Sequence, residues 1–548
     1  MNKNIFIGGA WPYANNSLHV GHLAALLPGD AIARYFRQNG DNVIYVSGTD
    51  SHGTPITEKA KKEKISPELI SQHYHEEFQK NFEDLDFSYD LYTSTMTPYH
   101  AKLVQEYLRK IMDNGYIYQK QELQDFCPNC NTFLSDREII GVCPHCGGKA
   151  KGDQCDECSA TLNASEVLEK KCSTCQHETI QKPNTHLYFS LSKFQDRIKE
   201  LNESRKGQWR YNATNETYKF LDMGLIDRAV TRQLPWGIDV PFEGFEDKKI
   251  YVWIEAVLGY LTAGQKVAEE RNIDFKNFMK KGNVVSYYSH GKDNIPFHTV
   301  IFPALLMAID NDINLPDYII SSEYVNMNNE KMSKSKGNLI SVNNLIKLFP
   351  KDSIRYYMLA NGPETKDINF SLDDFVQNHN KFLVGVLGNF INRNLSYINK
   401  KFEGKIPNGK IDDNIRNLTT ETFNKVGSLI EHGKLRQAVE TIISYVSAGN
   451  KYYDDQKPWV QVTEDIEGFN NTTYTCVYMM ANIANLFAPF IPQTCSKIKE
   501  KLNLDSKFVW EPVEIGKDIT ITNNDLLFER LTLEQIQNKY EELLNAVK

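Results

Sequence analysis

The hydrophobic pattern at the amino terminus predicts a buried strand, a turn and then a helix. The short apolar run at residues 5–7 breaks at the glycines and proline of residues 8–12. A helical pattern follows from about residue 23 to 38, and a second strand is expected at 42–47. A loop between a parallel strand and a helix N-terminus suits an anion, so a site is expected where the first strand ends.

The second half of the chain changes character twice. Residues 284–289 predict another buried strand, and from about residue 379 the pattern is helical. Apolar side chains recur there at 3.6-residue spacing, as at Leu435, Ala438, Val439, Ile442, Ile443 and Val446. We therefore expect a Rossmann-like parallel-sheet domain of the α/β class and a C-terminal α-helix bundle.

Composition is that of a globular protein with several cores. The chain has 548 residues, 41% hydrophobic and 24% charged, with a net charge of −8. Its length predicts roughly three or four domains. The negative charge argues against indiscriminate coating of nucleic acid, so an RNA partner would need local basic patches. We see no signal peptide and no apolar run of about 20 residues, so a cytoplasmic protein is expected.

Eight of the ten cysteines lie between residues 127 and 175 as four CxxC pairs, separated by 12, 8 and 13 residues. Each pair presents two thiolates to a tetrahedral Zn²⁺, so eight cysteines suit two zinc ions in closed, structural sites. Disulfides are a rival interpretation but are rare in the cytosol, and redox catalysis would not need four copies. The spacing alone leaves sequential, interleaved and nested pairings open.

Two short motifs suggest phosphate chemistry. His19 and His22 flank Gly21 in HVGH, where two imidazoles, a small residue and a helix dipole suit a polyphosphate. Alone, such histidines are more often ordinary loop or capping residues. Some 300 residues later comes KMSKSKGN (331–338), which by itself is most often a solvated basic turn.

Together these motifs resemble the two signatures of the class I aminoacyl-tRNA synthetases. Five segments in order resemble the methionyl-tRNA synthetase family: AWPYANNSLHVGH (10–22), GTDSHGTPI (48–56), YVWIEAVLGY (251–260), GKDNIPFH (291–298) and KMSKS (331–335). The resemblance covers nearly the whole chain. It implies ATP-dependent activation of methionine to methionyl-adenylate, with Mg²⁺ accompanying ATP, and transfer to the 3′ end of tRNA(Met), including the initiator.

The resemblance also implies residue roles. The catalytic groups would be His19, His22, Lys331 and Lys334, joined in ATP binding by Gly21, Gly291, Asp293, Ser333 and Ser335. Methionine would lie among Ala10, Trp11, Tyr13, Asp50, Trp253, Ala256, Tyr260 and His298, with Asp50 on its amino group. A flexible thioether suits an aromatic pocket. Trp11, Val257 and Phe302 depart from the leucine, proline and tryptophan frequent in the family.

Zinc and tRNA sites follow in the same way. The shortest gap, and the resemblance to members with one zinc, favour Cys143, Cys146, Cys155 and Cys158 around one ion and Cys127, Cys130, Cys172 and Cys175 around the other. LGNFINRN (387–394) and QKPW (456–459) resemble anticodon-reading segments. They imply that Asn389, Arg393 and Trp459 meet a CAU anticodon.

The predicted organisation has five parts: catalytic domain, first half (1–116); zinc-knuckle insertion (117–230); catalytic domain, second half (231–325); KMSKS linking domain (326–378); and anticodon-binding helices (379–548). No editing domain is expected in so short an insertion, and we expect a monomer. Three rivals stay open: a cysteinyl enzyme of the same class, a nucleotidyltransferase with HxGH, and a non-enzymatic zinc-ribbon RNA-binding module.

Overall fold

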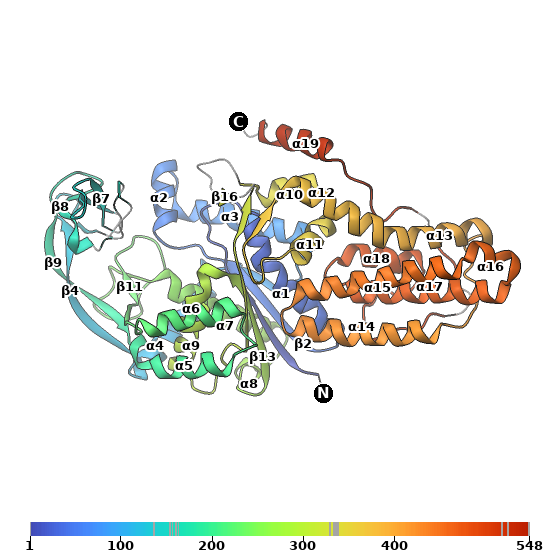
Figure 1. Cartoon of the computed structure of the whole chain (residues 1–548). Coiled ribbons are helices and arrows are strands. Elements are labelled where there is room, and N and C mark those ends of the chain that lie inside the picture. The colour runs from blue at the N-terminus through green and yellow to red at the C-terminus, as the bar shows by residue number, and fades with distance from the viewer. Residues whose placement is uncertain are drawn as a thin grey trace.

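A parallel five-stranded sheet forms the centre of the structure, a computed structural model (Figure 1). Its strands are β1 (Asn4–Gly9), β2 (Asn42–Thr49), β3 (Leu91–Ser94), β13 (Val284–Gly291) and β14 (Tyr318–Ser322), in the spatial order β14-β13-β1-β2-β3. The described residues are 2–134, 138–152, 155, 157–158, 162, 164–327, 330–331 (backbone only), 339–516, 519–522 and 525–545. The three predicted strands are present, and each ends two residues later than expected.

The order of the strands reverses between β1 and β13, which are neighbours although some 280 residues apart. In open parallel sheets, ligands bind in the crevice outside the carboxyl ends of the strands at such a reversal. Helix α1 (Val20–Gln38) starts there, directly after β1. The expected site therefore lies where the topology favours one.

Helices cover both faces of the sheet because its central strands are apolar on each side. Helices α1 and α7 (Val252–Glu270) pack directly on the central strands. The same part of the chain also contains α2 (Thr54–Glu63), α3 (Pro67–Asp84), α4 (Pro98–Asp113), α5 (Gln195–Ser204), α6 (Tyr211–Asp222), α8 (Phe275–Phe278) and α9 (Phe302–Ile309). Helix α7 packs against both β2 and α4, which brings it beside the end of β2.

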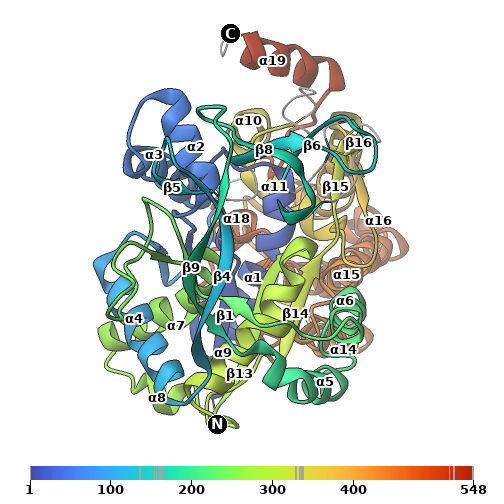
Figure 2. The same ribbon diagram turned by 90° about the vertical axis from the view of Figure 1, so that its left-hand side faces the viewer.

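A long two-stranded ribbon carries the cysteines away from the sheet (Figures 1 and 2). It consists of β4 (Ile117–Cys127) and β9 (Ile180–Phe189), paired antiparallel over ten residue pairs. Its tip holds the short strands β5 (Thr132–Phe133), β6 (Ile139–Val142), β7 (Lys149–Lys151) and β8 (Leu168–Cys172). The insertion is thus an arm with little core of its own.

A small unit links the sheet to the helices that follow. It contains β15 (Val325–Met327), β16 (Glu330–Lys331), β17 (Ile368–Phe370), α10 (Val342–Leu348), α11 (Lys351–Ala360) and α12 (Leu372–Asn378). The bundle then comprises α13 (Asn389–Phe402), α14 (Asp413–Glu431), α15 (Leu435–Gln456), α16 (Pro458–Glu464), α17 (Ile466–Phe487) and α18 (Pro492–Lys501). A last helix, α19 (Leu533–Asn545), returns to pack on α10 and α12 (Figure 1). The predicted fold class is confirmed, whereas the exact domain boundaries stay a prediction.

One apolar cluster continues from the sheet through α1 into the bundle. At its centre, Arg355 of α11 is fully buried and lies 2.5 Å from the Asp30 carboxylate of α1. The same guanidinium donates to the carbonyls of Leu85, Pro489 and Phe490 at 3.1, 3.2 and 2.9 Å. One side chain therefore ties the sheet, the linking unit and the bundle together. In the part of the chain that the structure describes, no helix is long and apolar enough to cross a membrane.

Candidate active site

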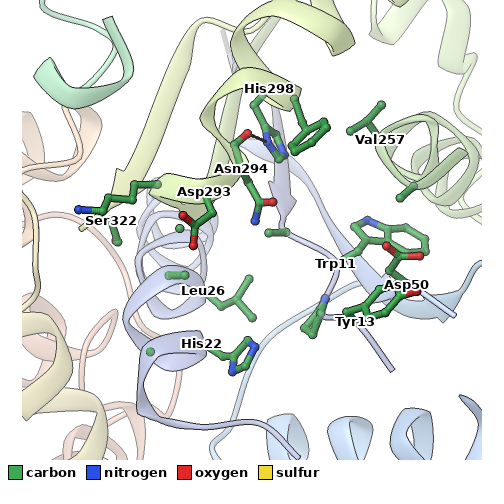
Figure 3. Close-up of a pocket in the computed structure, with 18 of the residues that line it drawn as sticks. Trp11, Tyr13, His22, Leu26, Asp50, Val257, Asp293, Asn294, His298 and Ser322 are labelled. Carbon is green, nitrogen blue, oxygen red and sulfur yellow. Dashed lines mark hydrogen bonds between the residues drawn. The ribbon is translucent and has the colours of Figure 1, made fainter. Parts of the chain in front are cut away.

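A pocket of about 640 Å³ opens at the reversal point of the sheet (Figure 3). It brings together these predicted residues: Ala10, Trp11, Tyr13, His19, Gly21, His22, Asp50, Trp253, Ala256, Tyr260, Gly291, Asp293 and His298. They come from the β1–α1 loop, α1, the end of β2, α7 and the segment after β13. Every candidate for ATP or methionine binding whose side chain the structure describes thus lines one pocket.

His19 and His22 form the N-terminal cap of α1. The ring Nδ1 of His19 accepts from the Gly21 N–H, and the Nδ1 of His22 accepts from the His19 N–H, each at 3.1 Å. The helix therefore starts at Val20, three residues earlier than predicted. Because each Nδ1 is an acceptor, a neutral ring carries its proton on Nε2 and donates from there. Burial, and then His19, hold the pKa of His22 well below its usual range.

Both described ends of the KMSKS segment lie at the pocket. Strand β16, which ends at Lys331, pairs with β15, whose Val325 lines the pocket. Beyond the segment, Ser341 forms an isolated antiparallel bridge with His19. Three predicted residues, Ser333, Lys334 and Ser335, lie outside the described residues, as does the side chain of Lys331. The two motifs, far apart in sequence, thus meet through the backbone that flanks them.

Asp50 supplies a buried carboxylate at the end of β2. Its backbone bridges to Tyr13, and its Oδ1 has no hydrogen-bond partner among the described residues. Burial, and then the charge of Glu255, raise the pKa of Asp50 well above its usual range. A buried acceptor without a donor is unfavourable. A bound ammonium group would supply that donor and favour the ionised form.

The opposite wall of the pocket is aromatic and uncharged. The Tyr260 hydroxyl lies 2.8 Å from His298 Nε2. His298 Nδ1 lies 2.9 Å from the Asn294 carbonyl (Figure 3). Because a carbonyl only accepts, His298 donates from Nδ1 and accepts from Tyr260. Burial lowers the pKa of His298 to about 4, so the ring is neutral at pH 7. Trp253 is half exposed and packs edge-on against Phe297. Such a wall suits an uncharged, polarizable side chain.

Polar groups after β13 and β14 form a third side. Asp293 accepts a hydrogen bond from the Tyr324 hydroxyl, and Lys292 lies 2.7 Å from the Glu323 carboxylate. The Lys292 ammonium also sits 3.9 Å from the centre of the Tyr324 ring. The sequence pattern predicted Gly291 and Asp293 at the site but did not predict Lys292, Glu323 and Tyr324. Their position directly after a buried strand was the available signal.

The eight clustered cysteines fall into the two predicted groups. Cys127, Cys130, Cys172 and Cys175 form one, and Cys143, Cys146, Cys155 and Cys158 the other, with all sulfurs of a group within 4.8 Å of one another. The closest sulfur pairs are 3.3 to 3.9 Å apart. A tetrahedral Zn–S bond of about 2.3 Å requires about 3.8 Å between sulfurs, so both groups fit Zn²⁺. Backbone N–H groups donate to several of the sulfurs at 3.4 Å, which favours thiolates.

Comparison with known proteins finds relatives along the whole chain. The family model for tRNA synthetases class I (M) matches residues 5–395, and the model for the anticodon binding domain of methionyl tRNA ligase matches 406–544. A methionine–tRNA ligase of Alkaliphilus oremlandii (strain OhILAs) is 46% identical over 528 residues, covering 96% of this chain and 97% of that protein. That of Bacillus mycoides (strain KBAB4) is 45% identical over 547 residues, 100% of both chains.

The chain belongs to the methionyl-tRNA synthetase family. Among solved structures, the methionyl-tRNA synthetase of Mycobacterium tuberculosis in complex with methionyl-adenylate superimposes with a TM-score of 0.80. The alignment covers 96% of this chain and 100% of that chain at 24% identity, a level that shows the shared fold.

The residues predicted to read the anticodon gather at the far end of the synthetase's bundle, around Tyr453. Arg393 of α13 lies over the Tyr453 ring at 4.3 Å and pairs with Asp454 at 2.7 Å. Asn389, one turn earlier, bonds Asn450 of α15 at 3.1 Å. Trp459 starts α16 with 48% of its surface exposed. The exposed Trp459 indole and the Arg393 guanidinium, which both pack on Tyr453, offer a stacking surface and base-edge donors.

Proposed function

We propose that this chain catalyses ATP-dependent activation of methionine and transfers the methionyl group to tRNA(Met), including the initiator. The observation that carries the proposal is the pocket itself. It combines a helix N-terminus with two imidazoles, a buried carboxylate whose Oδ1 has no hydrogen-bond donor among the described residues, and an uncharged aromatic wall. The names of the relatives, methionine–tRNA ligases at 45–46% identity, support the same function.

Methionine binds with its α-ammonium on Asp50 and its thioether against the aromatic wall. The ammonium satisfies the buried Oδ1, and its charge offsets the effects that raise the pKa of the carboxyl. The neutral pair of Tyr260 and His298 holds polar atoms at fixed positions at the far end of the pocket. The remaining contacts come from Ala10, Trp11, Tyr13, Trp253 and Ala256.

ATP binds with its phosphates at the start of α1 and its ribose near Gly291 and Asp293. The Nε2–H groups of His19 and His22 donate to phosphate oxygens, and Gly21 lets the phosphates approach the backbone. Lys331, Ser333, Lys334 and Ser335 act on the triphosphate from the other side. ATP enters as its Mg²⁺ complex, in which the ion neutralises part of the phosphate charge.

The reaction runs in two steps. The methionine carboxylate attacks the α-phosphate; a new P–O bond forms, the bond to pyrophosphate breaks, and pyrophosphate carries the electron pair away. The 2′-hydroxyl of the terminal tRNA adenosine then attacks the carbonyl carbon of the adenylate: a new ester C–O bond forms, the bond to the phosphate oxygen breaks, AMP leaves with the electron pair, and the hydroxyl proton is released to solvent. No group of the protein becomes covalently attached, so catalysis rests on positioning and on charge stabilisation.

The remaining parts hold tRNA. Asn389, Arg393 and Trp459 read a CAU anticodon, and two structural zinc ions order the arm, which leans toward the acceptor end. Each small cysteine group buries few apolar side chains beyond the cysteines themselves, so metal supplies the stability that such a core lacks. The enzyme works as a monomer in the cytoplasm, with the five-part domain organisation given by the sequence.

ATP–pyrophosphate exchange with each of the twenty amino acids tests the proposal. We expect exchange with methionine alone, and Lys334→Ala should lower its rate far more than it changes methionine affinity. Exchange driven by cysteine would identify the rival synthetase. No exchange with any amino acid would favour a nucleotidyltransferase or an RNA-binding module.

A further inference from the structure

Three buried side chains behind the pocket have no part in the proposed chemistry: His52, His100 and Glu255. All three are less than 5% exposed, and Glu255 is fully buried. His52 Nδ1 lies 2.9 Å from one Glu255 oxygen, and His100 Nε2 lies 4.0 Å from the other. That second oxygen and His100 Nε2 have no hydrogen-bond partner within the described residues. Burying a carboxylate costs desolvation free energy, and one hydrogen bond to an imidazole offsets only part of it. Such a group therefore calls for a functional explanation.

Glu255 belongs to α7 but is not among the residues of this helix that line the pocket. Trp253, Ala256 and Tyr260 follow one stripe of this helix and line the pocket. Glu255, Gly259 and Thr262 follow the next stripe, at spacings of four and three residues.

Each member of this second stripe contacts a different side chain. Glu255 binds His52, and Thr262 Oγ1 lies 2.8 Å from His100 Nδ1. A Cβ at Gly259 would lie 2.6 Å from the indole of Trp11, so the absence of a side chain makes room for that ring. His100 also packs on Trp11, with ring centres 6.0 Å apart. Helix α7 thus contacts His52, His100 and Trp11 through one stripe of residues.

The loop that carries Asp50 is anchored elsewhere by its backbone. The Ser51 carbonyl accepts from Trp236 Nε1 at 3.0 Å and from the Ser71 hydroxyl at 2.8 Å, and the His52 carbonyl accepts from the Tyr13 hydroxyl. The side chain of His52 links this loop to α7 by a hydrogen bond to Glu255. The hydrogen bond between His52 and Glu255 therefore joins the loop that carries Asp50 to α7, the helix that carries Trp253 and Tyr260.

We propose that Glu255, held between His52 and His100, is a positioning residue for methionine, because it fixes Asp50 at the spacing from α7 that amino-acid binding requires. This inference rests on the proposed function, in which Asp50 receives the ammonium group. Glu255 touches neither methionine nor ATP; it acts through His52 and through its charge.

The charge of Glu255 adds a measurable signature. The ionisable groups that face it are Asp50 and His52 on the loop after β2, Tyr13 on the loop after β1, and His100 on α4. After burial, Glu255 is the next cause that raises the pKa of Asp50. Removing its charge should therefore keep Asp50 ionised to lower pH, so the acidic limb of kcat/KM for methionine should move to lower pH.

Steady-state ATP–pyrophosphate exchange by full-length variants tests the inference. Glu255→Ala removes the link and should raise KM for methionine about tenfold or more, with KM for ATP changed less than about twofold. Glu255→Gln keeps the shape and can still accept from His52. It should restore most of the methionine KM while shifting the acidic limb.

Asp352→Ala is the matched control, because Asp352 is also buried and accepts from the Thr494 N–H far from the pocket. It should lower Tm without changing either KM. Glu255→Ala with methionine KM within about twofold of wild type, or with both KM values raised equally, overturns the inference. If that variant does not fold, an unshifted acidic limb in Glu255→Gln overturns it. Absence of methionine-dependent exchange in the wild type would instead overturn the proposed function.

Discussion

Replacing Arg355 with methionine removes the guanidinium that joins the sheet, the linking unit and the bundle, while keeping most of the side-chain volume. The substitution leaves three backbone carbonyls, those of Leu85, Pro489 and Phe490, without this donor. Asp30 keeps Arg34 at 2.8 Å but loses its buried partner on α11. The variant therefore has several buried acceptors that are no longer satisfied.

The expected destabilisation is large for one residue. Breaking a buried ion pair by removing one partner typically costs about 3–5 kcal/mol. An unfolding entropy of about 2.1 cal/mol/K per residue over 548 residues converts this to a Tm decrease of about 3–4 °C, if the chain unfolds as one unit. A smaller cooperative unit would give a larger decrease, so this range is a lower bound.

The pH dependence has a definite sign. Burial would raise the pKa of Asp30, but Arg34, Arg355 and Ser88 outweigh it and hold this pKa below its usual range. A carboxyl with a depressed folded pKa stabilises the fold above its unfolded pKa of about 3.9, and this contribution is lost as pH falls further. The Tm difference between wild type and variant should therefore be constant from about pH 8 to about pH 5.

Differential scanning calorimetry of both proteins measures the effect. Arg436→Met is the control, because Arg436 makes an exposed pair with Glu440 at 3.2 Å and such pairs contribute less than about 1 kcal/mol. Its Tm should change by less than about 1 °C. A decrease of under about 1 °C in Arg355→Met would refute the assignment of Arg355 as the central tie.

Three further outcomes are expected. His22→Asn retains an acceptor for the helix cap but has no donor at Nε2, so the exchange rate should fall about 10²- to 10³-fold with an unchanged Tm; an unchanged rate would rule out phosphate contact. Trp459→Ala should raise KM for tRNA(Met) in aminoacylation while exchange without tRNA stays the same, and equal effects on both assays would count against anticodon stacking. Metal analysis should find two zinc ions per chain, and chelation should increase hydrogen exchange in β4, β9 and the knuckles but not in the sheet; one zinc would remove one of the two four-cysteine sites.

The sequence predicted the fold well where local pattern and topology agree. The apolar run of β1, the glycine-rich break and the spacing of the CxxC pairs each have a local cause, and the structure has the elements they predict. The start of α1 was predicted three residues late, because the pattern of apolar positions does not reveal an imidazole that caps a helix. Helix α7 shows a second limit of sequence patterns. The spacing of its pocket-lining residues is the same as that of an ordinary buried face, so the pocket is recognised only when the elements packed around α7 are known.

The parts of the site that could not be predicted depend on long-range contacts. Glu255 stood in a quoted motif, but its partner His52 is 203 residues away in sequence. Lys292 and Glu323 come directly after two neighbouring strands of the sheet, β13 and β14. Such pairs carry no local periodicity, so only the order of strands in the sheet brings them together. Asn389 and Arg393, by contrast, are four residues apart on one helix, a spacing that by itself places two side chains on a shared face, and both bond Asn450.

The shared apolar cluster between α1 and the bundle has a practical consequence. Tyr35 packs on Trp510 with ring centres 4.7 Å apart, and the Tyr287 hydroxyl donates to the Glu431 carbonyl at 3.1 Å. A recombinant fragment that stopped before residue 379 would expose the apolar surface of this cluster to water and should therefore aggregate. Inhibitor screening and crystallisation would accordingly need the intact polypeptide, and exchanging the tRNA-reading end between enzymes would require redesigning the outer face of the first helix as well.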